Sequence, residues 1–397
     1  MNILLIPMAA PYDGVKHAGG NIANYYLNSY VEQPDMDVTL ITWQNHNEIS
    51  RFYYQKKGIH VFLHASPKIN RKLHNKVYQM VDADYASYMF DVPYMKDVER
   101  DLKKLKAAGY VPDVILLQWT QIVLLEKEIR KYYPSAKYIA IEEDVSFLGF
   151  YRRYLLEKKP LSSFMKRCLY RRLLARELSA VSACTVTIVN NRKDFRLLQR
   201  CRIPENQIYQ WVPYYHSYED VDRSGHNQTE IIFFGALQRE ENYTAVIWFI
   251  ENVFCKLDSN FVFTVIGNQP HSTLLPYASD KITFTGFVKD IAPYLSRCLC
   301  MAAPLQFGAG IKIKVLEGMS AGVPVLTGKV GIEGIGGRDG KTYLHCETRA
   351  EYVQAINKLA NDREYTCRIA ENAREHIARH FDLNQSKKDV LTLIREL

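Results

Sequence analysis

Residues 303–330 read APLQFGAGIKIKVLEGMSAGVPVLTGKV, and the fold assignment depends on this stretch. An apolar strand is predicted to end at Pro304, a loop with Gly308 and Gly310 follows, and a helix is expected from about Ile311. Glycine allows a backbone to approach a ligand closely. The amide groups and dipole at a helix start attract anions such as a diphosphate. The stretch therefore predicts a strand, a turn and a helix that together form a phosphate-binding mouth.

Three charged residues follow the glycine turn. Lys312 and Lys314 add positive charge at the mouth, and the Glu317 carboxylate can accept hydrogen bonds from both hydroxyls of a ribose. The alternative is an ordinary turn in which Glu317 pairs with Lys314 on a solvated helix face. The stretch by itself leaves both interpretations open.

Short β-rich runs alternate with helical stretches along the rest of the chain, which is typical of parallel α/β units. The polar segment 214–229 interrupts this alternation and predicts a linker. We expect a Rossmann-like domain over residues 1–213, a second one over 230–375, and a final helix over 376–397 that packs back toward the first. The fold class is α/β, with two domains facing each other across a cleft and ligands at the carboxyl ends of the strands.

Composition narrows the function classes. The chain has 397 residues, enough for two cores, and a net charge of +8. This charge favours nucleotide phosphates or an anionic membrane face over nucleic acid, whose binders carry denser basic patches. The eight cysteines lack zinc-ligand spacing, so we expect no metal site and a reducing cytoplasmic setting. No apolar run approaches the roughly 18–20 residues of a membrane span.

The order of the C-terminal motifs resembles the signature region of family-4 glycosyltransferases of the GT-B fold. The matching motifs are IIFFGAL (231–237), ITFTGFVKDIAPYL (282–295), FGAG (307–310), LEGM (316–319), GVPV (322–325) and VGIEG (330–334). The N-terminal half resembles the family mainly in its first strand and glycine loop. The resemblance implies an acceptor-binding first domain and a donor-binding second domain.

The resemblance implies transfer of a sugar, with retention, from a nucleotide-diphosphate sugar to a saccharide or lipid-linked acceptor. It implies neither a metal nor a cofactor beyond that co-substrate, and a setting in bacterial surface polysaccharide or glycoconjugate synthesis. Glu317 would bind the ribose, and Lys312 would hold the diphosphate. The expected donor-binding residues are Gly19, Gly20, Gly235, Gly308, Ala309, Gly310, Ile311, Lys312, Glu317 and Glu333.

This sequence also departs from the family pattern. The first of the family's paired glutamates is replaced by Ala309, and the basic residues that often follow the domain's first strand appear as Ala236 and Glu241. Lys312 would replace the cations, and Glu333 would replace the carboxylate unless it is a solvent-facing loop residue. The alternatives are a non-catalytic homologue that binds glycan or stabilises a partner transferase, and a nucleotide-sugar epimerase of the same fold.

The N-terminal half offers candidates for the acceptor side. Gly19 and Gly20 precede a helix predicted to begin at Asn21, and His17 lies in the loop before it. Where the family often carries a histidine, this chain has Gln118, so His17 and Gln118 are the expected acceptor-binding residues. Three adjacent carboxylates, residues 142–144, follow another strand, and their proximity predicts raised pKa values.

We expect Glu143 or Asp144 to act as a base or to bind the acceptor hydroxyl, with Lys312 as the third catalytic residue. The alternative is a solvated acidic turn or the cap of the next helix.

The segment 151–177, YRRYLLEKKPLSSFMKRCLYRRLLARE, carries nine Lys or Arg residues against two acids, interleaved with apolar residues. Such a face can lie on anionic lipid, which would make the protein peripheral at the inner face of the plasma membrane. It is equally compatible with ordinary surface helices whose arginines extend to solvent. Pro160 divides it into two pieces in either case.

Overall fold

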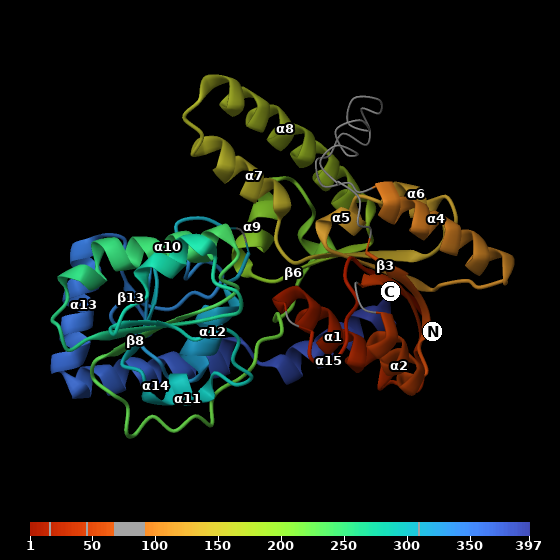
Figure 1. The fold of residues 1–397 in the computed structure, drawn as a ribbon. Helices are drawn as coiled ribbons and strands as arrows, with labels where there is room; N and C mark the ends of the chain where they lie inside the picture. Colours follow the sequence, from red (N-terminus) through yellow and green to blue (C-terminus); the bar gives the residue numbers. More distant parts are fainter. Residues whose placement is uncertain (16, 45–46, 67–91, 309) are drawn as a thin grey trace. The chain divides into compact units, whose positions relative to one another are not determined.

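The computed structural model describes residues 1–15, 17–44, 47–66, 92–308 and 310–397. The chain divides into two compact units. The first consists of Met1–Tyr214 and Leu383–Leu397, and the second consists of Tyr215–Asp382. Each unit is an α/β structure built on its own parallel sheet (Figure 1).

The first unit has a seven-stranded parallel sheet in the order β3-β2-β1-β4-β5-β6-β7. Its strands are β1 (Asn2–Pro7), β2 (Asp37–Gln44), β3 (His60–Ala65), β4 (Val114–Gln118), β5 (Lys137–Glu142), β6 (Val186–Val189) and β7 (Ile208–Gln210). The central strands read as unbroken apolar runs because helices cover both faces of the sheet. Chain order runs outward from β1 in both directions, so the strand order reverses between β1 and β4.

Helices cover this sheet on two sides. One face is packed by α4 (Val92–Ala107), α5 (Thr120–Val123), α6 (Glu126–Arg130), α8 (Pro160–Ala183) and α9 (Arg192–Arg200). The other face is packed by α1 (Ala18–Val31), α2 (Asn47–Lys57) and α15 (Leu383–Glu396) (Figure 1). The crossover from β5 to β6 contains an additional helix, α7 (Ser146–Leu155), which lies antiparallel beside α8.

The base of the α7–α8 hairpin is fixed by Glu177 of α8. Its two carboxylate oxygens accept hydrogen bonds from Ser146 N (2.8 Å) and Phe147 N (2.9 Å), the first amides of α7. These amides have no partner within a helix, so a carboxylate satisfies them and also complements the helix dipole. Glu177 is only 1% exposed, and this burial raises the pKa of its carboxyl group. The hairpin is therefore anchored to the first unit by a buried cap.

The C-terminal helix α15 is joined to the first unit by a buried polar cluster. The Tyr26 hydroxyl donates to Val212 O (2.6 Å) and lies 2.7 Å from Ser386 Oγ, which accepts from Val212 N (2.8 Å). The Tyr26 ring stacks on Trp211 with a centroid separation of 3.8 Å. Ser386 thus satisfies polar atoms that α15 would otherwise bury without partners.

The second unit has a six-stranded parallel sheet in the order β10-β9-β8-β11-β12-β13. Its strands are β8 (Glu230–Phe234), β9 (Val262–Ile266), β10 (Ile282–Phe284), β11 (Cys300–Ala303), β12 (Val325–Thr327) and β13 (Leu344–His345). The order again runs outward from the unit's first strand and reverses between β8 and β11. In doubly wound sheets such a reversal separates the two flanking loops and opens a crevice.

Helices cover both faces of the second sheet. They are α10 (Glu240–Asn252), α11 (Ala292–Arg297), α12 (Ile313–Ser320), α13 (Arg349–Asn361) and α14 (Arg363–His380). On one face, Phe249 of α10 packs against Phe263 of β9 and Tyr352 of α13, with ring centroids 4.8 and 6.1 Å apart. On the other face, α12 packs against α14 (Figure 1).

Several element boundaries differ from those expected from the sequence. Helix α1 begins at Ala18 rather than Asn21, and α12 begins at Ile313 rather than Ile311. The tail expected to be helical from Ala350 onward contains three helices. The second unit extends to Asp382, whereas the second domain was expected to end at 375. The expected linker packs on the second unit, where Tyr218 N donates to Ser320 Oγ (3.1 Å) and Arg223 Nη2 donates to Cys298 O (2.7 Å).

Two further observations concern the chain as a whole. All eight cysteines are free thiols. Within the described ranges, no helix combines the length and the apolar character needed to cross a bilayer.

The polar contact of α15 generates a stability prediction. Replacing Ser386 by Ala leaves Val212 N without its acceptor and removes one partner of the Tyr26 hydroxyl. We expect Ser386→Ala to lower the free energy of unfolding by about 1–3 kcal/mol, measured by urea denaturation. Thr392→Ala, at an exposed position of the same helix, is the matched control and should change stability by less than about 0.5 kcal/mol. Equal effects of the two substitutions would contradict this account of how α15 is held.

Candidate functional site

The candidate donor site lies in the second unit, where the strand order reverses. The loop after β8 begins at Gly235, and the loop after β11 runs from Pro304 to Lys312. Both loops leave the carboxyl edge of the sheet from adjacent strands. The chain leaves the two strands in opposite directions, so the two loops diverge. Doubly wound sheets bind their ligands at the carboxyl ends of the strands at such a point.

Close packing around Gly235 leaves no room for a side chain at this position. Its φ is 155°, and a Cβ at this position would lie 2.6 Å from Lys314 Nζ. A Cβ on Gly267, after β9, would lie 2.1 Å from Gly235 O. Any side chain at Gly235 would therefore displace the Lys314 amine. The structure places Gly235 and Lys314 in direct contact at the edge of the β8 loop.

Lys314 is positioned differently from the expectation that it adds charge at the open mouth. Its amine donates to Asn242 Oδ1 (2.5 Å) and lies 4.5 Å from the centroid of the Phe233 ring. Burial is the main reason that the pKa of Lys314 is lowered to about 7; the charge of Glu241 opposes this shift, and the charges of Arg239 and Lys312 add to it. Lys314 is therefore a buried amine beneath the β8 loop rather than a solvated cation. Asn242, which holds it, was missed because a polar residue inside a helix gives no sequence signal of its own.

Lys312 lies over the glycine turn. Its Nζ donates to Gly310 O (2.7 Å), and a Cβ on Gly308 would lie 3.4 Å from the same nitrogen. Gly308 has φ 125°, in the region that favours glycine. Lys312 occupies the N-cap position of α12, and Ile311 immediately precedes it. Ala309 lies outside the described residues. The lysine ammonium and the first amides of α12 are thus brought together at one turn, as a diphosphate site requires.

Glu317 follows one turn into α12. Its Oε1 accepts a hydrogen bond from His216 N (3.3 Å). Burial raises the pKa of Glu317 to about 7, although the His216 hydrogen bond and the charge of Lys314 both lower it. The carboxylate is therefore not on a solvated helix face, which was the alternative interpretation. His216 could not be recognised beforehand because it lies in the segment expected to be a linker.

Glu333 is in the loop that follows β12, the strand next to β11. It is half-buried. The backbone of this loop lies close to the sheet, since a Cβ on Gly331 would overlap Thr327 Oγ1. The structure places Glu333 at the carboxyl edge of the second sheet, and its role toward a sugar remains a prediction.

The first unit has an equivalent edge between β1 and β4. His17 is the N-cap of α1, and its Nδ1 accepts from Gly20 N (2.9 Å). A Cβ on Gly19 would lie 2.5 Å from the Trp119 ring. Gly19, Gly20 and His17 are therefore held together by local packing. Because His17 Nδ1 is used as a helix cap, any acceptor contact would have to come from the rest of its ring.

Trp119 is a feature that the sequence interpretation did not select. It directly follows β4, next to Gln118, and has φ 73° and ψ 142°. A non-glycine residue in this region is strained by about 1–3 kcal/mol, and such strain concentrates at functional sites. The half-buried indole ring lies over the start of α1, with its centroid 6.3 Å from that of His17.

The acidic run 142–144 contributes to a polar network at the same edge. Glu143 Oε1 accepts from Gln118 Nε2 (2.6 Å), and Oε2 accepts from Asn190 Nδ2 (3.0 Å). Asn190 Oδ1 in turn accepts from Trp211 Nε1. These residues follow or end neighbouring parallel strands, which is why they meet. Asn190 stands directly after β6, and this position relative to the strand was the signal that could have identified it.

The raised pKa values expected for the acidic run have a different main cause. Burial raises the pKa of Glu142 to about 8 and that of Glu143 to about 7, and repulsion from neighbouring carboxylates is a smaller contribution. Glu142 is 1% exposed and accepts from the Thr120 hydroxyl, whereas Glu143 and Asp144 are half-buried. The first two amides of the following helix, α7, donate to Glu177.

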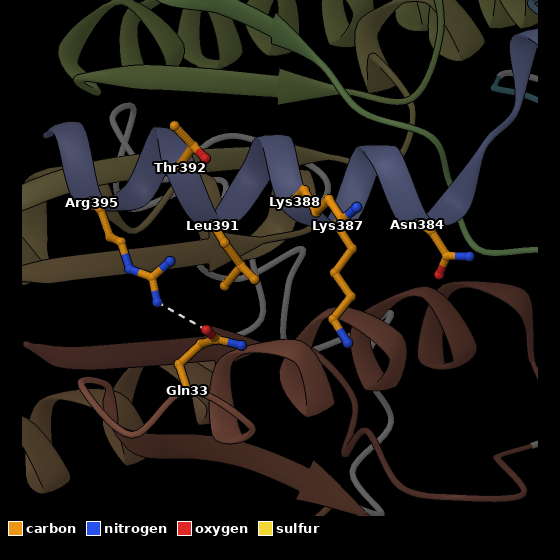
Figure 2. A pocket seen from close by; sticks show the side chains of 7 residues that line it. All are labelled: Gln33, Asn384, Lys387, Lys388, Leu391, Thr392 and Arg395. Atoms are coloured by element: carbon orange, nitrogen blue, oxygen red, sulfur yellow. Dashed lines mark hydrogen bonds between the residues drawn. The ribbon is translucent and has the colours of Figure 1, made fainter.

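Two surface hollows lie away from these edges. One, of about 570 Å³, lies along α15 and is lined by Gln33, Asn384, Lys387, Lys388, Leu391, Thr392 and Arg395 (Figure 2). Two of its three basic groups pair with acids: Lys387 binds Glu32, and Arg395 binds Asp35. The other, of about 780 Å³, includes Val114 and Lys137 at the amino ends of β4 and β5. Neither has the glycine turn or the helix start of the candidate donor site.

In the part of the chain that the structure describes, no set of three or more His, Cys, Asp or Glu side chains is arranged to hold a metal ion.

Comparison with known proteins extends these observations. Residues 228–362 match the family model described as Glycosyl transferases group 1. No curated protein matches the chain. Among solved structures, sucrose-phosphate synthase from Thermosynechococcus elongatus is similar over 100% of this chain and 98% of its own, with 14% identity and a TM-score of 0.73.

Two other solved structures share the fold. Anabaena HepE in complex with UDP-glucose has 12% identity and a TM-score of 0.68, with 100% of both chains covered. A mutant of S. aureus TarM in complex with fondaparinux, α-GlcNAc-glycerol and UDP has 9% identity and a TM-score of 0.66, with 99% of both chains covered. The narrower assignment to family 4 remains a prediction. The chain has the GT-B fold, and its residues 228–362 match the model of the glycosyl transferases group 1 family.

Proposed function

We propose that this protein transfers a sugar, with retention, from a nucleotide-diphosphate sugar to a saccharide or lipid-linked acceptor, in the synthesis of a bacterial surface polysaccharide or glycoconjugate. The observation that carries the proposal is the turn before α12. There the Lys312 ammonium lies over Gly308 and Gly310 at the start of a helix, and Glu317 follows one turn later. In a nucleotide-diphosphate sugar the diphosphate is attached directly to the ribose, so neighbouring turns of the chain can bind the two groups.

The donor residues would act on different parts of that ligand. The amides at the start of α12 and the Lys312 ammonium would bind the diphosphate, and Glu317 would accept hydrogen bonds from the ribose hydroxyls. As the bond to the sugar breaks, negative charge develops on the leaving diphosphate. Preorganised donors at this position stabilise that charge and thereby lower the barrier. The UDP and UDP-glucose held by Anabaena HepE support a nucleotide sugar as the ligand class.

On the acceptor side, Glu143 would receive the proton of the acceptor hydroxyl. Its carboxylate is oriented by Gln118 and Asn190, and its pKa of about 7 suits a group that both accepts and releases a proton near neutral pH. Trp119, the residue after Gln118, offers a half-buried aromatic face at the same edge of the sheet, and aromatic faces suit the apolar side of a sugar ring.

Nucleotide binding tests the donor site. Lys312→Ala should weaken UDP or GDP binding by about 1.5–3 kcal/mol, the usual contribution of a hydrogen bond to a charged group, measured by titration calorimetry. Lys281→Ala, at an exposed position before β10, is the matched control and should bind as the wild type does. If Lys281→Ala weakened binding as much as Lys312→Ala, a general charge effect would replace the proposed site. Release of UDP or GDP from nucleotide sugars would then separate a transferase from a non-catalytic homologue, which would bind without releasing.

The pH dependence of binding tests Glu317. Because the pKa of this carboxyl is raised to about 7, it loses its charge as the pH falls through that value, and its bonds to the ribose weaken. Lys314 has the opposite effect, because it gains charge below about 7. We therefore compare the wild type with Glu317→Gln, which retains Lys314. The affinity advantage of the wild type should be largest above pH 7 and should shrink below it; an advantage independent of pH would exclude an ionised Glu317 as the ribose acceptor.

A third test concerns the proposed base. Glu143→Gln should leave UDP binding unchanged and should lower turnover of the donor by about 100-fold or more, the usual contribution of general-base catalysis. Asp144→Asn is the companion variant, because the sequence did not distinguish the two carboxylates. A larger loss of turnover in Asp144→Asn than in Glu143→Gln would transfer the role to Asp144.

A further inference from the structure

The far end of the α7–α8 hairpin exposes an unusual concentration of large apolar side chains. Six of the twelve most exposed large hydrophobic residues in the described chain lie between residues 151 and 165. They are Tyr151, Leu155, Leu156, Leu161, Phe164 and Met165. Single exposed apolar residues are normal on a protein surface, but a contiguous group marks a binding surface.

Helix geometry gathers these residues on one side. Leu161, Phe164 and Met165 are separated by three and four positions in α8, so their side chains share a helix face. They are 75%, 65% and 57% exposed. Leu155 and Leu156 end α7 on the other side of the same turn. We call the residues 155–165 the hairpin tip; it lies away from the sheet of the first unit (Figure 1).

The charge of the hairpin has one sign. Residues 151–177 contain nine Lys or Arg residues and two Glu residues. Both acids are used internally. Glu177 caps α7, and Glu157 accepts hydrogen bonds from Lys166 Nζ (2.6 Å), Ser162 Oγ (2.7 Å) and Lys159 N (3.0 Å), which lower its pKa to about 2. Lys158 and Lys159 are exposed directly beside the apolar residues of the tip.

We propose that the hairpin tip binds the surface of a membrane that contains anionic lipid. The apolar side chains of the tip would enter the boundary between headgroups and acyl chains, and the surrounding lysines and arginines would contact lipid phosphates. A second copy of the chain fits this surface less well, because pairing two tips would bring their positive charges together. Exposed apolar side chains surrounded by positive charge favour a partner with an apolar interior and a negative surface. An anionic bilayer has both properties.

The attachment of the hairpin suits this role. Glu177 fixes the start of α7 to α8, and the Tyr151 and Tyr170 rings lie 5.0 Å apart between the two helices. The tip is therefore held at the end of a braced pair of helices, so that insertion need not unfold any part of the first unit. The proposal is independent of the donor site, since none of these residues belongs to it.

Vesicle binding by the full chain tests the proposal. The probes are vesicles of phosphatidylcholine alone and of an equal mixture of phosphatidylcholine and phosphatidylglycerol, assayed by co-sedimentation. We expect binding to the mixed vesicles and little to the neutral ones. Lys158→Gln with Lys159→Gln should weaken binding by roughly 5-fold for each lysine. Lys103→Gln with Lys106→Gln, at exposed positions of α4, is the matched control and should bind as the wild type does.

The apolar part is tested separately. Phe164→Ser should weaken binding by about 10-fold or more, whereas Phe52→Ser, at an equally exposed position of α2, should not. Unchanged thermal unfolding of each variant confirms that the fold is retained. The proposal is overturned if the wild type does not bind the mixed vesicles, or if Phe164→Ser and Phe52→Ser bind equally. Self-association of the wild type that Phe164→Ser abolishes, without vesicle binding, would assign the tip to a second copy instead.

Discussion

The reversal of strand order between β8 and β11 is the constraint on which the candidate site depends. Because each unit begins with its central strand, the chain must leave that strand in one direction and later return to its other side. The loops after β8 and β11 therefore diverge, and helix α12 can start at the edge of the sheet without another element covering it. Gly235, Lys312 and Glu317 all take their positions from this arrangement. The same reversal between β1 and β4 positions Gly19, His17 and Trp119 in the first unit.

Burial of ionisable groups is the common physical property of both edges. Lys314, Glu317 and Glu143 have pKa values of about 7 because burial disfavours their charged forms. Perturbed pKa values of this kind concentrate at functional sites, which agrees with the positions of Lys314 and Glu317 in α12 and of Glu143 directly after β5. Each is also oriented by an amide donor or acceptor: Asn242 for Lys314, the His216 amide for Glu317, and Gln118 and Asn190 for Glu143. The protein thus builds groups that titrate near neutral pH and holds each in a fixed orientation.

The sequence was sufficient for those parts of the structure that depend on local pattern. Apolar runs bounded by glycine or polar turns identified the strands of both sheets except β13, because a strand buried on both faces is apolar along most of its length, whereas β13 has only two residues. Helix ends were less accurate: His17 caps the amide of Gly20, three residues later, so α1 starts earlier than Asn21. Contacts between distant residues were not predictable. Lys314 and Lys312 look equivalent in IKIK, and only the three-dimensional position of Gly235 shows that one amine is buried and the other lies over the turn. The His216–Glu317 bond was missed for the same reason.

The length of the β5–β6 crossover gives the α7–α8 hairpin its significance. A parallel crossover needs about a dozen residues and usually a single helix, and the C-terminal half of α8 already meets that need by packing Leu173 and Val181 against the sheet. The remainder, α7 and the first half of α8, adds no core of comparable size and exposes Leu161 and Phe164 to solvent. An extension that exposes apolar side chains and concentrates positive charge carries a cost in solubility and in electrostatic repulsion. An anionic bilayer would remove both costs, because its interior would cover the apolar groups and its phosphates would neutralise the cations. Such a surface is the partner that this extension requires.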